Sequence, residues 1–453
     1  MMKNIPKESF FVFLALMLML IPFFTYIVHF FVLYLIVSKG KEWFFKGLFF
    51  IFLMRFENPI FHPVEVNFSL LTVLTIFIIM LFKYVKIKKI TFSKLERKFY
   101  ILIVLILAAA FLGSMLLTLS VVRLLLFSIV VFTVFRSVEL AKEYDFLSFL
   151  NNFTILFVLI SFPLIFLSYG YPRDLYAGIT NHSQSLGVIF VPIYIIYFIQ
   201  YLSKKIIHTN FHRIILVLGA IEIVLSGSRT AVVSVVGVIV LFYIVNFFVA
   251  RKSSKKELFY QSIFVVAMLI VLINFTEDIN SKVQSFVLKS SQQSGSKLME
   301  TVPERIFLAK ASINNFISYP YTGIGFGVQI DYWDPAEADV ANIKYLPGTN
   351  IMYSKPLEKG NLYLSVFEET GLIAGLYFLL LLLYLLIQLI KSGDLAVLMS
   401  YIGILIIFNG EATLFAPAGM GNYQLLLLAI FFQVAMRKRK TVNESLIKKK
   451  SFR

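Results

Sequence analysis

The sequence predicts an all-α polytopic membrane protein with about 12 transmembrane helices and one large extracytoplasmic loop between the ninth and tenth spans. Of the 453 residues, 59% are hydrophobic and only 15% are charged, and the mean hydropathy is +0.84. Apolar runs of about 20 residues recur, which is the length with which an α-helix crosses a ~30 Å hydrocarbon core. A transmembrane β-barrel would instead show short segments of alternating polarity.

The apolar runs place the spans in order along the chain. Twelve spans are expected at residues 10–37, 67–84, 99–135 (two spans with a turn near Thr118–Ser120), 147–167, 186–202, 214–225, 230–249, 258–275, 361–390, 395–408 and 422–436. An alternative divides 10–37 into two short spans and adds 43–54, which gives 14. Helices that short barely cross the hydrocarbon core, so 12 is the preferred count.

Basic residues set the expected orientation. The net charge of +17 is concentrated in short loops and in the C-terminal tail, which is the pattern of cytoplasmic loops rather than of a nucleic-acid-binding surface. Both termini are therefore expected in the cytoplasm. The predicted parts are an N-terminal transmembrane bundle (1–275), an extracytoplasmic loop with an amphipathic helix (276–360), C-terminal transmembrane helices (361–437) and a basic tail (438–453).

The composition also limits the chemistry. The chain has no cysteine, so it has no thiolate nucleophile and no Cys-based metal site, and its five histidines give no reason to expect a metal centre. No cofactor and no nucleic-acid partner are expected. The candidate chemistry therefore rests on arginine, lysine and carboxylate side chains at the outer face of the membrane.

Two arginines are candidates for binding a phosphate or diphosphate. Arg229 follows Ser226-Gly227-Ser228 in a tight turn between two spans, where a guanidinium fork would lie beside the free N–H groups of a helix start. The alternative is an arginine that anchors the membrane interface. Arg305 follows a capping box formed by Thr301 and Glu304 at the start of an amphipathic helix, and a surface ion pair is its alternative.

Further polar residues lie near the outer ends of the spans. Glu358 and Lys359 precede the span that begins at Asn361, where they form either a base and an anion contact or a solvated ion pair. Glu368 and Glu369 lie inside that span, where ionisable groups usually face a cavity or a partner. The same question applies to Glu222 and Arg123 in other spans, while the glycine-rich turn at 323–327 is expected mainly to redirect the chain.

Three segments together resemble the superfamily of O-antigen ligases and O-antigen polymerases. The chain carries Leu225-Ser226-Gly227-Ser228-Arg229-Thr230-Ala231, then Arg305 before a helix and Pro320-Tyr321-Thr322-Gly323-Ile324-Gly325-Phe326-Gly327, then Asn361-Leu362-Tyr363-Leu364 with Glu369-Thr370-Gly371-Leu372. Asn181-His182-Ser183-Gln184, in an outer loop that also contains Arg173, is similar to a further family position. The resemblance extends over roughly residues 150–435.

The resemblance implies a metal-independent glycosyltransferase of the bacterial cytoplasmic membrane. Such proteins take a glycan from a polyprenyl-diphosphate carrier such as undecaprenyl diphosphate; ligases pass it to lipid A core and polymerases pass it to another lipid-linked repeat. It assigns diphosphate binding to Arg229 and Arg305, with Lys359 as a further anion contact. Arg173, His182, Gln184, Asn361 and Glu369 are expected to support the site.

The sequence departs from the ligase pattern at one position. Ligases usually carry histidine before the asparagine of the third segment, and Gly360 stands there in this chain. A polymerase is therefore the preferred interpretation, with Glu358 as the candidate catalytic base. A ligase and a transporter or flippase of the same architecture remain alternatives, and a chain-length regulator or a flippase is a candidate partner.

Overall fold

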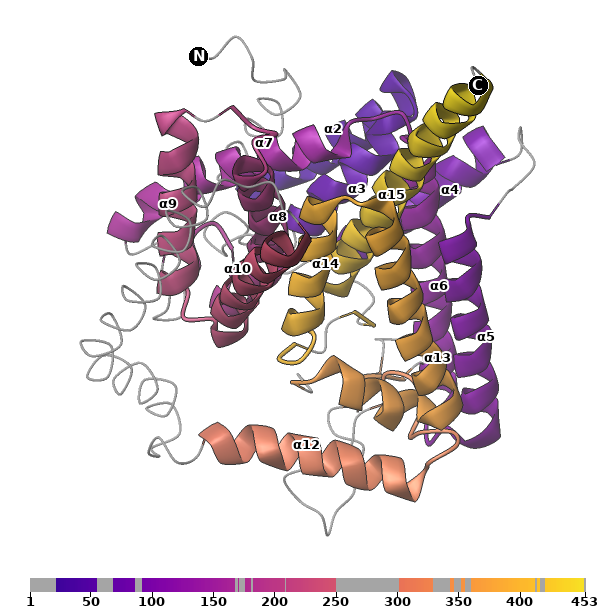
Figure 1. Cartoon of the computed structure of the whole chain (residues 1–453). Coiled ribbons are helices and arrows are strands. Elements are labelled where there is room, and N and C mark those ends of the chain that lie inside the picture. The colour runs from indigo at the N-terminus through magenta and orange to yellow at the C-terminus, as the bar shows by residue number, and fades with distance from the viewer. Residues whose placement is uncertain are drawn as a thin grey trace.

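The structure is a computed structural model of the whole chain, and it is described here for the residues whose placement is defined (Figure 1). These residues are 22–54, 68–85, 92–167, 170, 176–180, 182–207, 209–249, 301–328, 343–345, 352–354, 360–411, 414–415 and 420–451. The predicted span at 258–275 lies outside them.

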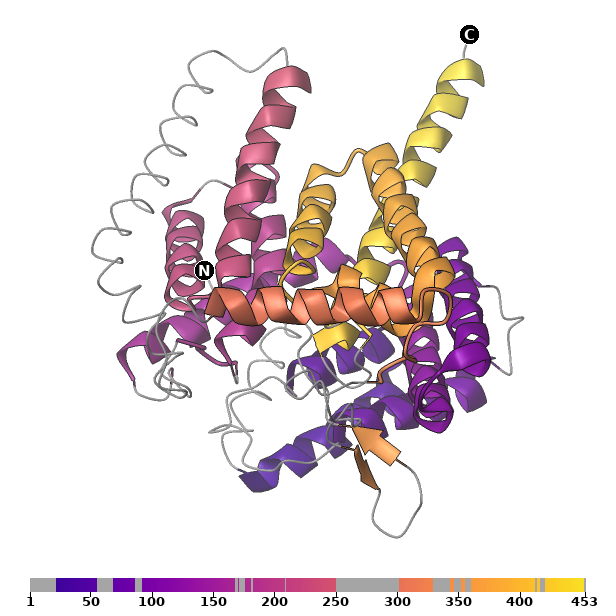
Figure 2. The ribbon, with the colours of Figure 1, turned by 90° about the horizontal axis from the view of Figure 1, so that it is seen from below.

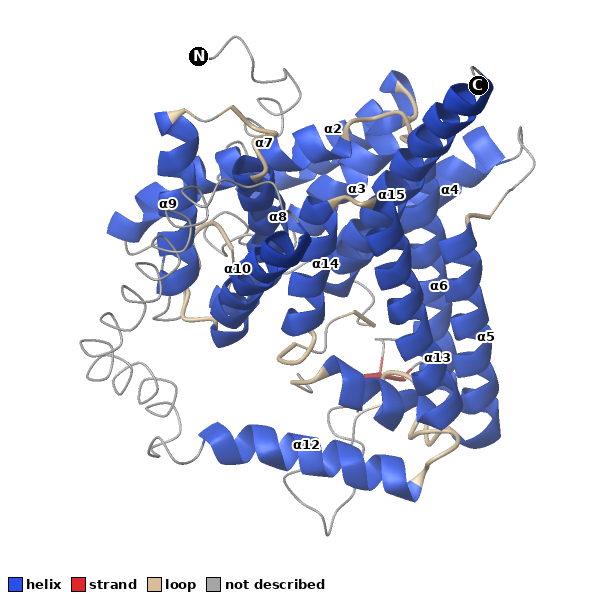
Figure 3. Cartoon of the chain, viewed as in Figure 1, coloured by secondary structure: helices blue, strands red, loops and turns tan. Residues whose placement is uncertain are grey.

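The described chain is mostly helical, as predicted (Figure 3). Its helices are α2 (Pro22–Lys39), α3 (Glu42–Met54), α4 (Phe68–Met80) with a π-helical turn (Leu81–Val85), α5 (Lys94–Gly113), α6 (Leu117–Leu140), α7 (Phe146–Ser161) with a 3-10 turn (Phe162–Phe166), α8 (Ser183–Leu202), α9 (Asn210–Leu225), α10 (Arg229–Val249), α12 (Thr301–Ser318), α13 (Leu362–Ser392), α14 (Leu395–Ile407) and α15 (Met420–Ser451). A short antiparallel pair of strands, β1 (Ile343–Tyr345) and β2 (Met352–Ser354), was not predicted.

Four described helices are long and apolar enough to cross a membrane. They are Leu117–Leu140, Phe146–Phe166, Ser183–Leu202 and Leu362–Ser392. Ser183–Leu202 is central, because 94% of its most apolar window is buried by other helices. The predicted count of about 12 spans stays a prediction, since shorter apolar helices such as α14 do not reach this length.

The bundle has two ends of different chemistry (Figures 1 and 2). Helix α12 lies across one end, near the α5–α6 turn and the start of α13, and we call this the α12 end. At the opposite end lie the start of α5, the α13–α14 turn and the second half of α15. Lysines and arginines from the start of α5, the α6–α7 turn, the end of α13 and α15 surround one cavity there, and we call this the basic end.

Asp394 holds three segments together at the basic end. It is the N-cap of α14, and its Oδ2 lies 3.5 Å from Nζ of Lys205 and 3.1 Å from Nζ of Lys438. Burial alone would raise the pKa of Asp394, but the two lysines and the hydrogen bonds outweigh it and hold that pKa below its usual value. The carboxylate thus stays ionised at neutral pH and fixes the loop after α8 and the basic stretch of α15.

Helices α5 and α6 form the predicted pair within 99–135, with their turn at 114–116 rather than at Thr118–Ser120. Ser93 and Glu96 form a capping box that starts α5. Glu96 is fully buried and also accepts hydrogen bonds from Arg136 of α6, so the pair is neutralised inside the bundle. This pair joins α5 to α6, and Arg136 also contacts Glu139 of its own helix at 3.1 Å.

Helix α13 is broken at Gly371, which has φ +73° and ψ −176°. The break leaves backbone groups without their helical partners, and residues 320–325 supply replacements. The N–H groups of Ile324 and Gly325 donate to the carbonyls of Glu368 and Glu369 at 2.9 and 3.1 Å, and Leu372 N–H donates to Pro320 O at 2.7 Å. The glycine-rich turn and the broken helix therefore satisfy each other's free backbone N–H and C=O groups.

Glycine at position 371 is required for two reasons, and Gly371→Ala is expected to destabilise the protein. An added Cβ would lie 2.3 Å from the carbonyl oxygen of Tyr321, and an L side chain is strained at positive φ by about 1–2 kcal/mol. Gly393 is the matched control, because it has φ +64° but nothing within 4 Å of an added Cβ. Melting of the detergent-solubilised protein, followed by tryptophan fluorescence, should show a fall for Gly371→Ala at least about twice that for Gly393→Ala; equal falls would contradict the close packing of the break.

Candidate functional site

The turn that carries Arg229 is built by its serines and glycine. Ser226 Oγ donates to the carbonyl of Ile223 at 2.7 Å and accepts from Ser228 N–H at 3.3 Å. Gly227 has φ +64°, which reverses the chain between α9 and α10. Arg229 is then the first residue of α10 and is exposed, while Ser226 and Ser228 are buried.

The Arg229 turn packs against two other segments at the α12 end. A Cβ on Gly187, in the second turn of α8, would lie 2.8 Å from Ser228 Oγ. A Cβ on Gly410, after α14, would lie 2.0 Å from Cγ2 of Thr230. Small residues at 187 and 410 thus let the starts of α8 and α10 and the end of α14 meet at one point.

Asn361 joins this group through the end of α14. Its Oδ1 accepts from Leu364 N–H at 3.1 Å as the N-cap of α13, and its Nδ2 donates to the carbonyl of Asn409 at 3.3 Å. Leu362 N–H also donates to Phe408 O at 2.9 Å. Asn361, whose supporting role stays a prediction, therefore contacts the segment that packs against the Arg229 turn.

His182 and Gln184 lie at the start of α8. His182 is the N-cap, and its Nδ1 accepts from the N–H of Gln184 at 3.1 Å. Thr180 fixes the same turn by donating to the carbonyl of His182 at 3.0 Å. Both side chains are half-buried, and Gly187 on the next turn touches Ser228, so these two predicted residues lie on the same side as the Arg229 turn.

Arg305 lies in the second turn of α12, the helix that the capping-box pattern predicts from Thr301. Its side chain is outside the described part of the structure, and so is that of Glu304. Ile313 and Ile317, on the apolar face, are 43% and 66% exposed. The bundle instead receives the face of Ser312, Asn315 and Phe316, whose ring packs on Phe367 at 5.6 Å.

Glu368 anchors α12 to α13. The carboxylate is fully buried, and its two oxygens accept from Ser312 Oγ at 2.9 Å and from Asn315 Nδ2 at 2.8 Å. Such charge-assisted hydrogen bonds are typically stronger than neutral ones. A carboxylate inside an apolar helix is thus matched by a polar helix lying across the bundle.

Glu369 anchors the glycine-rich turn, and its described contacts are not with the Arg229 turn. Its Oε2 accepts from Gly327 N–H at 2.7 Å, and it attracts Arg123 of α6 electrostatically. Arg123 donates to the carbonyl of the same Gly327. Glu369 and Arg123 therefore bind the two backbone groups of the same residue, Gly327, and through it Glu369 joins the α13 break to α6.

Three predicted site residues lie outside the described residues: Arg173, Glu358 and Lys359. The last two fall between β2, which ends at Ser354, and Gly360, which has φ +71°. Positive φ favours glycine over a residue with a side chain, and this gives a physical reason for glycine at position 360. Nothing lies within 4 Å of an added Cβ there, so the constraint is the backbone and not crowding.

The structure adds residues that the sequence patterns did not single out. Asn409 bonds Asn361, and Glu411 is only 2% exposed just beyond it. A polar break, Asn409-Gly410-Glu411, directly after an apolar run was the available signal. Ser312 and Asn315 had no signal of their own, because their partner Glu368 is more than 50 residues away in the chain.

Among the described residues, no group of three or more histidine, aspartate or glutamate side chains is placed to hold a metal ion. Arg229 is exposed, and no described carboxylate pairs with it. The α10 start adds N–H groups and the positive end of a helix dipole. The arrangement suits a phosphate-bearing ligand at the α12 end.

The apolar helices and their polar breaks define a helical integral membrane protein. Residues 214–379 of the chain match the O-antigen ligase family, from α9 and the Arg229 turn through α12 and the glycine-rich turn into α13. The match confirms the resemblance to the superfamily of O-antigen ligases and polymerases. No curated protein matches the chain.

The two adjacent glutamates are expected to fix different segments. Glu368→Ala removes the acceptor of Ser312 and Asn315, so amide hydrogen exchange in α12 should rise about tenfold or more. Glu369→Ala should instead raise exchange at 323–327, where it binds Gly327. Exchange measured by mass spectrometry on both variants provides the mutual control; the same pattern of change in both would contradict separate anchoring.

Proposed function

We propose that the protein is a membrane glycosyltransferase that polymerises polyprenyl-diphosphate-linked oligosaccharides into a cell-surface polysaccharide. The family match supports a glycosyl-transferring enzyme of ligase or polymerase type. The observation that carries the proposal is Arg229, exposed at a helix start inside the matched region and unpaired with any described carboxylate. The α12 end is the proposed reaction face.

In the proposed reaction, the anomeric carbon of the donor sugar loses its bond to the diphosphate oxygen and forms a bond to an acceptor hydroxyl oxygen. Negative charge develops on the departing polyprenyl diphosphate, where Arg229 and Arg305 would stabilise it. The acceptor hydroxyl gives its proton to Glu358, our candidate base. Both lipid-linked partners are held at the membrane surface, which reduces the entropy lost when they meet.

The proposed orientation places the α12 end outside the cytoplasm, in a bacterial cytoplasmic membrane. The basic end then faces the cytoplasm, as expected when lysine and arginine mark the inner loops. Labelling with an impermeant thiol reagent, on intact cells with a cysteine at Ser294 or at Ser445, distinguishes the two orientations. Labelling at 445 alone would reverse the proposal.

The ligase alternative is retained because the matched family is that of O-antigen ligases. Gly360 favours a polymerase, since the histidine of the ligase pattern is absent and positive φ favours glycine there. A purified protein given only lipid-linked repeats should lengthen the glycan if it is a polymerase. Transfer only when lipid A core is added would instead identify a ligase. The absence of both reactions would favour a transporter.

Arg229→Lys and Arg305→Lys are each expected to lower turnover about 10- to 100-fold while the protein still accumulates in the membrane. Lysine keeps the charge but loses the fork that binds two phosphate oxygens. Arg213→Lys is the control, because Arg213 donates to Tyr201 Oη at 3.0 Å near the loop that follows α8, away from the Arg229 turn. Chain elongation is measured in detergent with lipid-linked repeats, and near-parental rates in both variants would remove the diphosphate role.

Glu358→Gln is expected to abolish turnover and to leave binding of the lipid-linked donor intact. Glutamine keeps the size of the side chain and removes the proton acceptor. Lys359→Gln is the matched variant, and it should weaken donor binding while the bound donor still reacts. Parental turnover in Glu358→Gln would exclude this residue as the base and would direct attention to His182 or Glu411, which lie in the segments that contact the Arg229 turn.

A further inference from the structure

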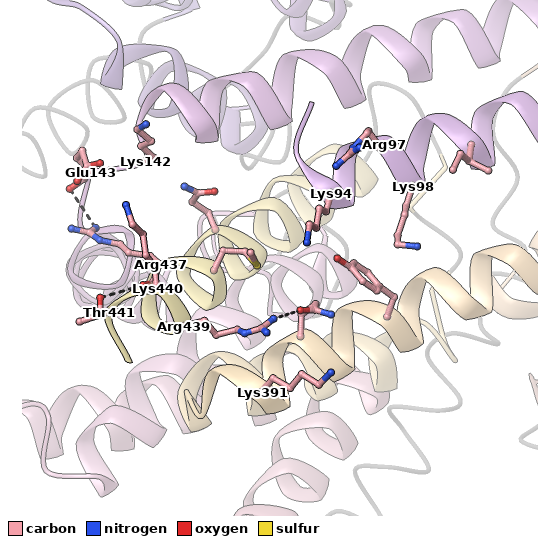
Figure 4. Close-up of a pocket in the computed structure, with 15 residues that line it drawn as sticks. Lys94, Arg97, Lys98, Lys142, Glu143, Lys391, Arg437, Arg439, Lys440 and Thr441 are labelled. Carbon is pink, nitrogen blue, oxygen red and sulfur yellow. Dashed lines mark hydrogen bonds between the residues drawn. The ribbon is translucent and has the colours of Figure 1, made fainter. Parts of the chain in front are cut away.

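A cavity of about 1150 Å³ opens at the basic end (Figure 4). The turn between α9 and α10, which carries Arg229, lies toward the opposite end of the bundle (Figure 1). The first turns of α5, the α6–α7 turn, the last turns of α13 and the α15 helix form its walls. Eight of the lining residues are lysine or arginine, and one lining residue, Glu143, is acidic. Figure 4 shows these side chains arriving from separate helices around a shared space.

Two of the cavity's basic side chains have no carboxylate partner within the described part of the chain. Arg97 of α5 and Lys391 of α13 form no ion pair with a described carboxylate. Cations held together from different helices repel one another unless an anion lies between them. The side chains of Arg97 and Lys391 are exposed, so an anion can reach them. The cavity thus has the charge of an anion site.

Several of the cations are held in place by neutral partners. Arg437 donates to the carbonyls of Glu143 and Tyr144 at 3.4 and 3.3 Å, and Arg439 donates to Gln388 Oε1. Lys98 Nζ lies 4.5 Å from the centre of the Tyr384 ring. These contacts orient the side chains without cancelling their charge. The basic side chains of a solvated surface would not need to be held in this way.

The cavity continues onto an apolar surface. Ile101 lines it and is 49% exposed, and Val104, one turn further along α5, is 62% exposed. On α13, Ile387, Leu383 and Leu380 follow with 39%, 49% and 61% exposure. A free phosphate ion would use only the basic rim, whereas a phospholipid would use the rim and this apolar surface together.

We propose that the cavity binds an anionic phospholipid, with its phosphate groups among the basic side chains and its acyl chains along α5 and α13. Basic pockets between helices at the cytoplasmic side of a membrane are suited to lipids that carry more than one phosphate. The site is separate from the proposed donor site, and the proposal does not rest on the glycosyl transfer. A bound lipid would join α5, α13 and α15 where their charges repel.

Native mass spectrometry of the detergent-purified full chain tests the proposal by counting bound lipids. We expect diphosphatidylglycerol to bind at least about tenfold more tightly than phosphatidylcholine. Arg97→Gln combined with Lys391→Gln should weaken diphosphatidylglycerol binding about 10- to 30-fold. The control combines Lys39→Gln with Lys41→Gln, which removes the same charge from exposed positions outside the cavity and should leave binding at the parental level.

Two outcomes would overturn the proposal. An equal loss of binding in both double variants would mean that general surface charge attracts the lipid. Complete displacement of the lipid by millimolar inorganic diphosphate would identify a site for a soluble anion instead. Melting temperatures of the lipid-free double variants are measured alongside, and lipid-induced stabilisation of the parent and of the control, but not of the cavity variant, supports the assignment even where one variant is less stable.

Discussion

The pairing between the break in α13 and the glycine-rich turn is the constraint on which the α12 end depends. A helix interrupted inside an apolar bundle must have its freed N–H and C=O groups satisfied by other protein groups. Ile324, Gly325 and Pro320 supply these bonds, and Gly323 and Gly371 allow the two backbones to touch. Because the turn directly follows α12, satisfying the break also fixes where α12 ends.

The two glutamates before the break extend this constraint in different directions. Glu368 takes two hydrogen bonds from α12, while Glu369 holds Gly327 together with Arg123 of α6. The loop region is thereby attached to the transmembrane helices by charged groups, of which Glu368 is fully buried, and not by apolar packing alone. Loss of either carboxylate would remove the acceptor of its donors, which are Ser312 and Asn315 for Glu368 and the Gly327 N–H for Glu369.

The sequence predicted the local features of the α12 end well and the distant contacts poorly. The turn before Arg229, the helix that begins at Thr301 and the helix start at Asn361 each follow from short-range chemistry of capping and turns. The roles of Glu368 and Glu369 did not, because a carboxylate in an apolar run shows that a partner is needed but not which one. Ser312, Asn315 and Gly327 lie 42 to 56 residues away along the chain.

The separation of charge between the two ends gives the molecule its functional asymmetry. At the α12 end, Arg229 stands at a helix start beside segments rich in neutral polar groups, which suits reversible binding of a single phosphate-bearing ligand. At the basic end, many cations converge, and Asp394 pairs with two of them, Lys205 and Lys438. If both proposals hold, an anion bound at the basic end stabilises the bundle, whereas the diphosphate at the α12 end has to be released after each transfer. Among the described residues, more cations gather around the cavity of the basic end than around the Arg229 turn, which is consistent with these opposite requirements.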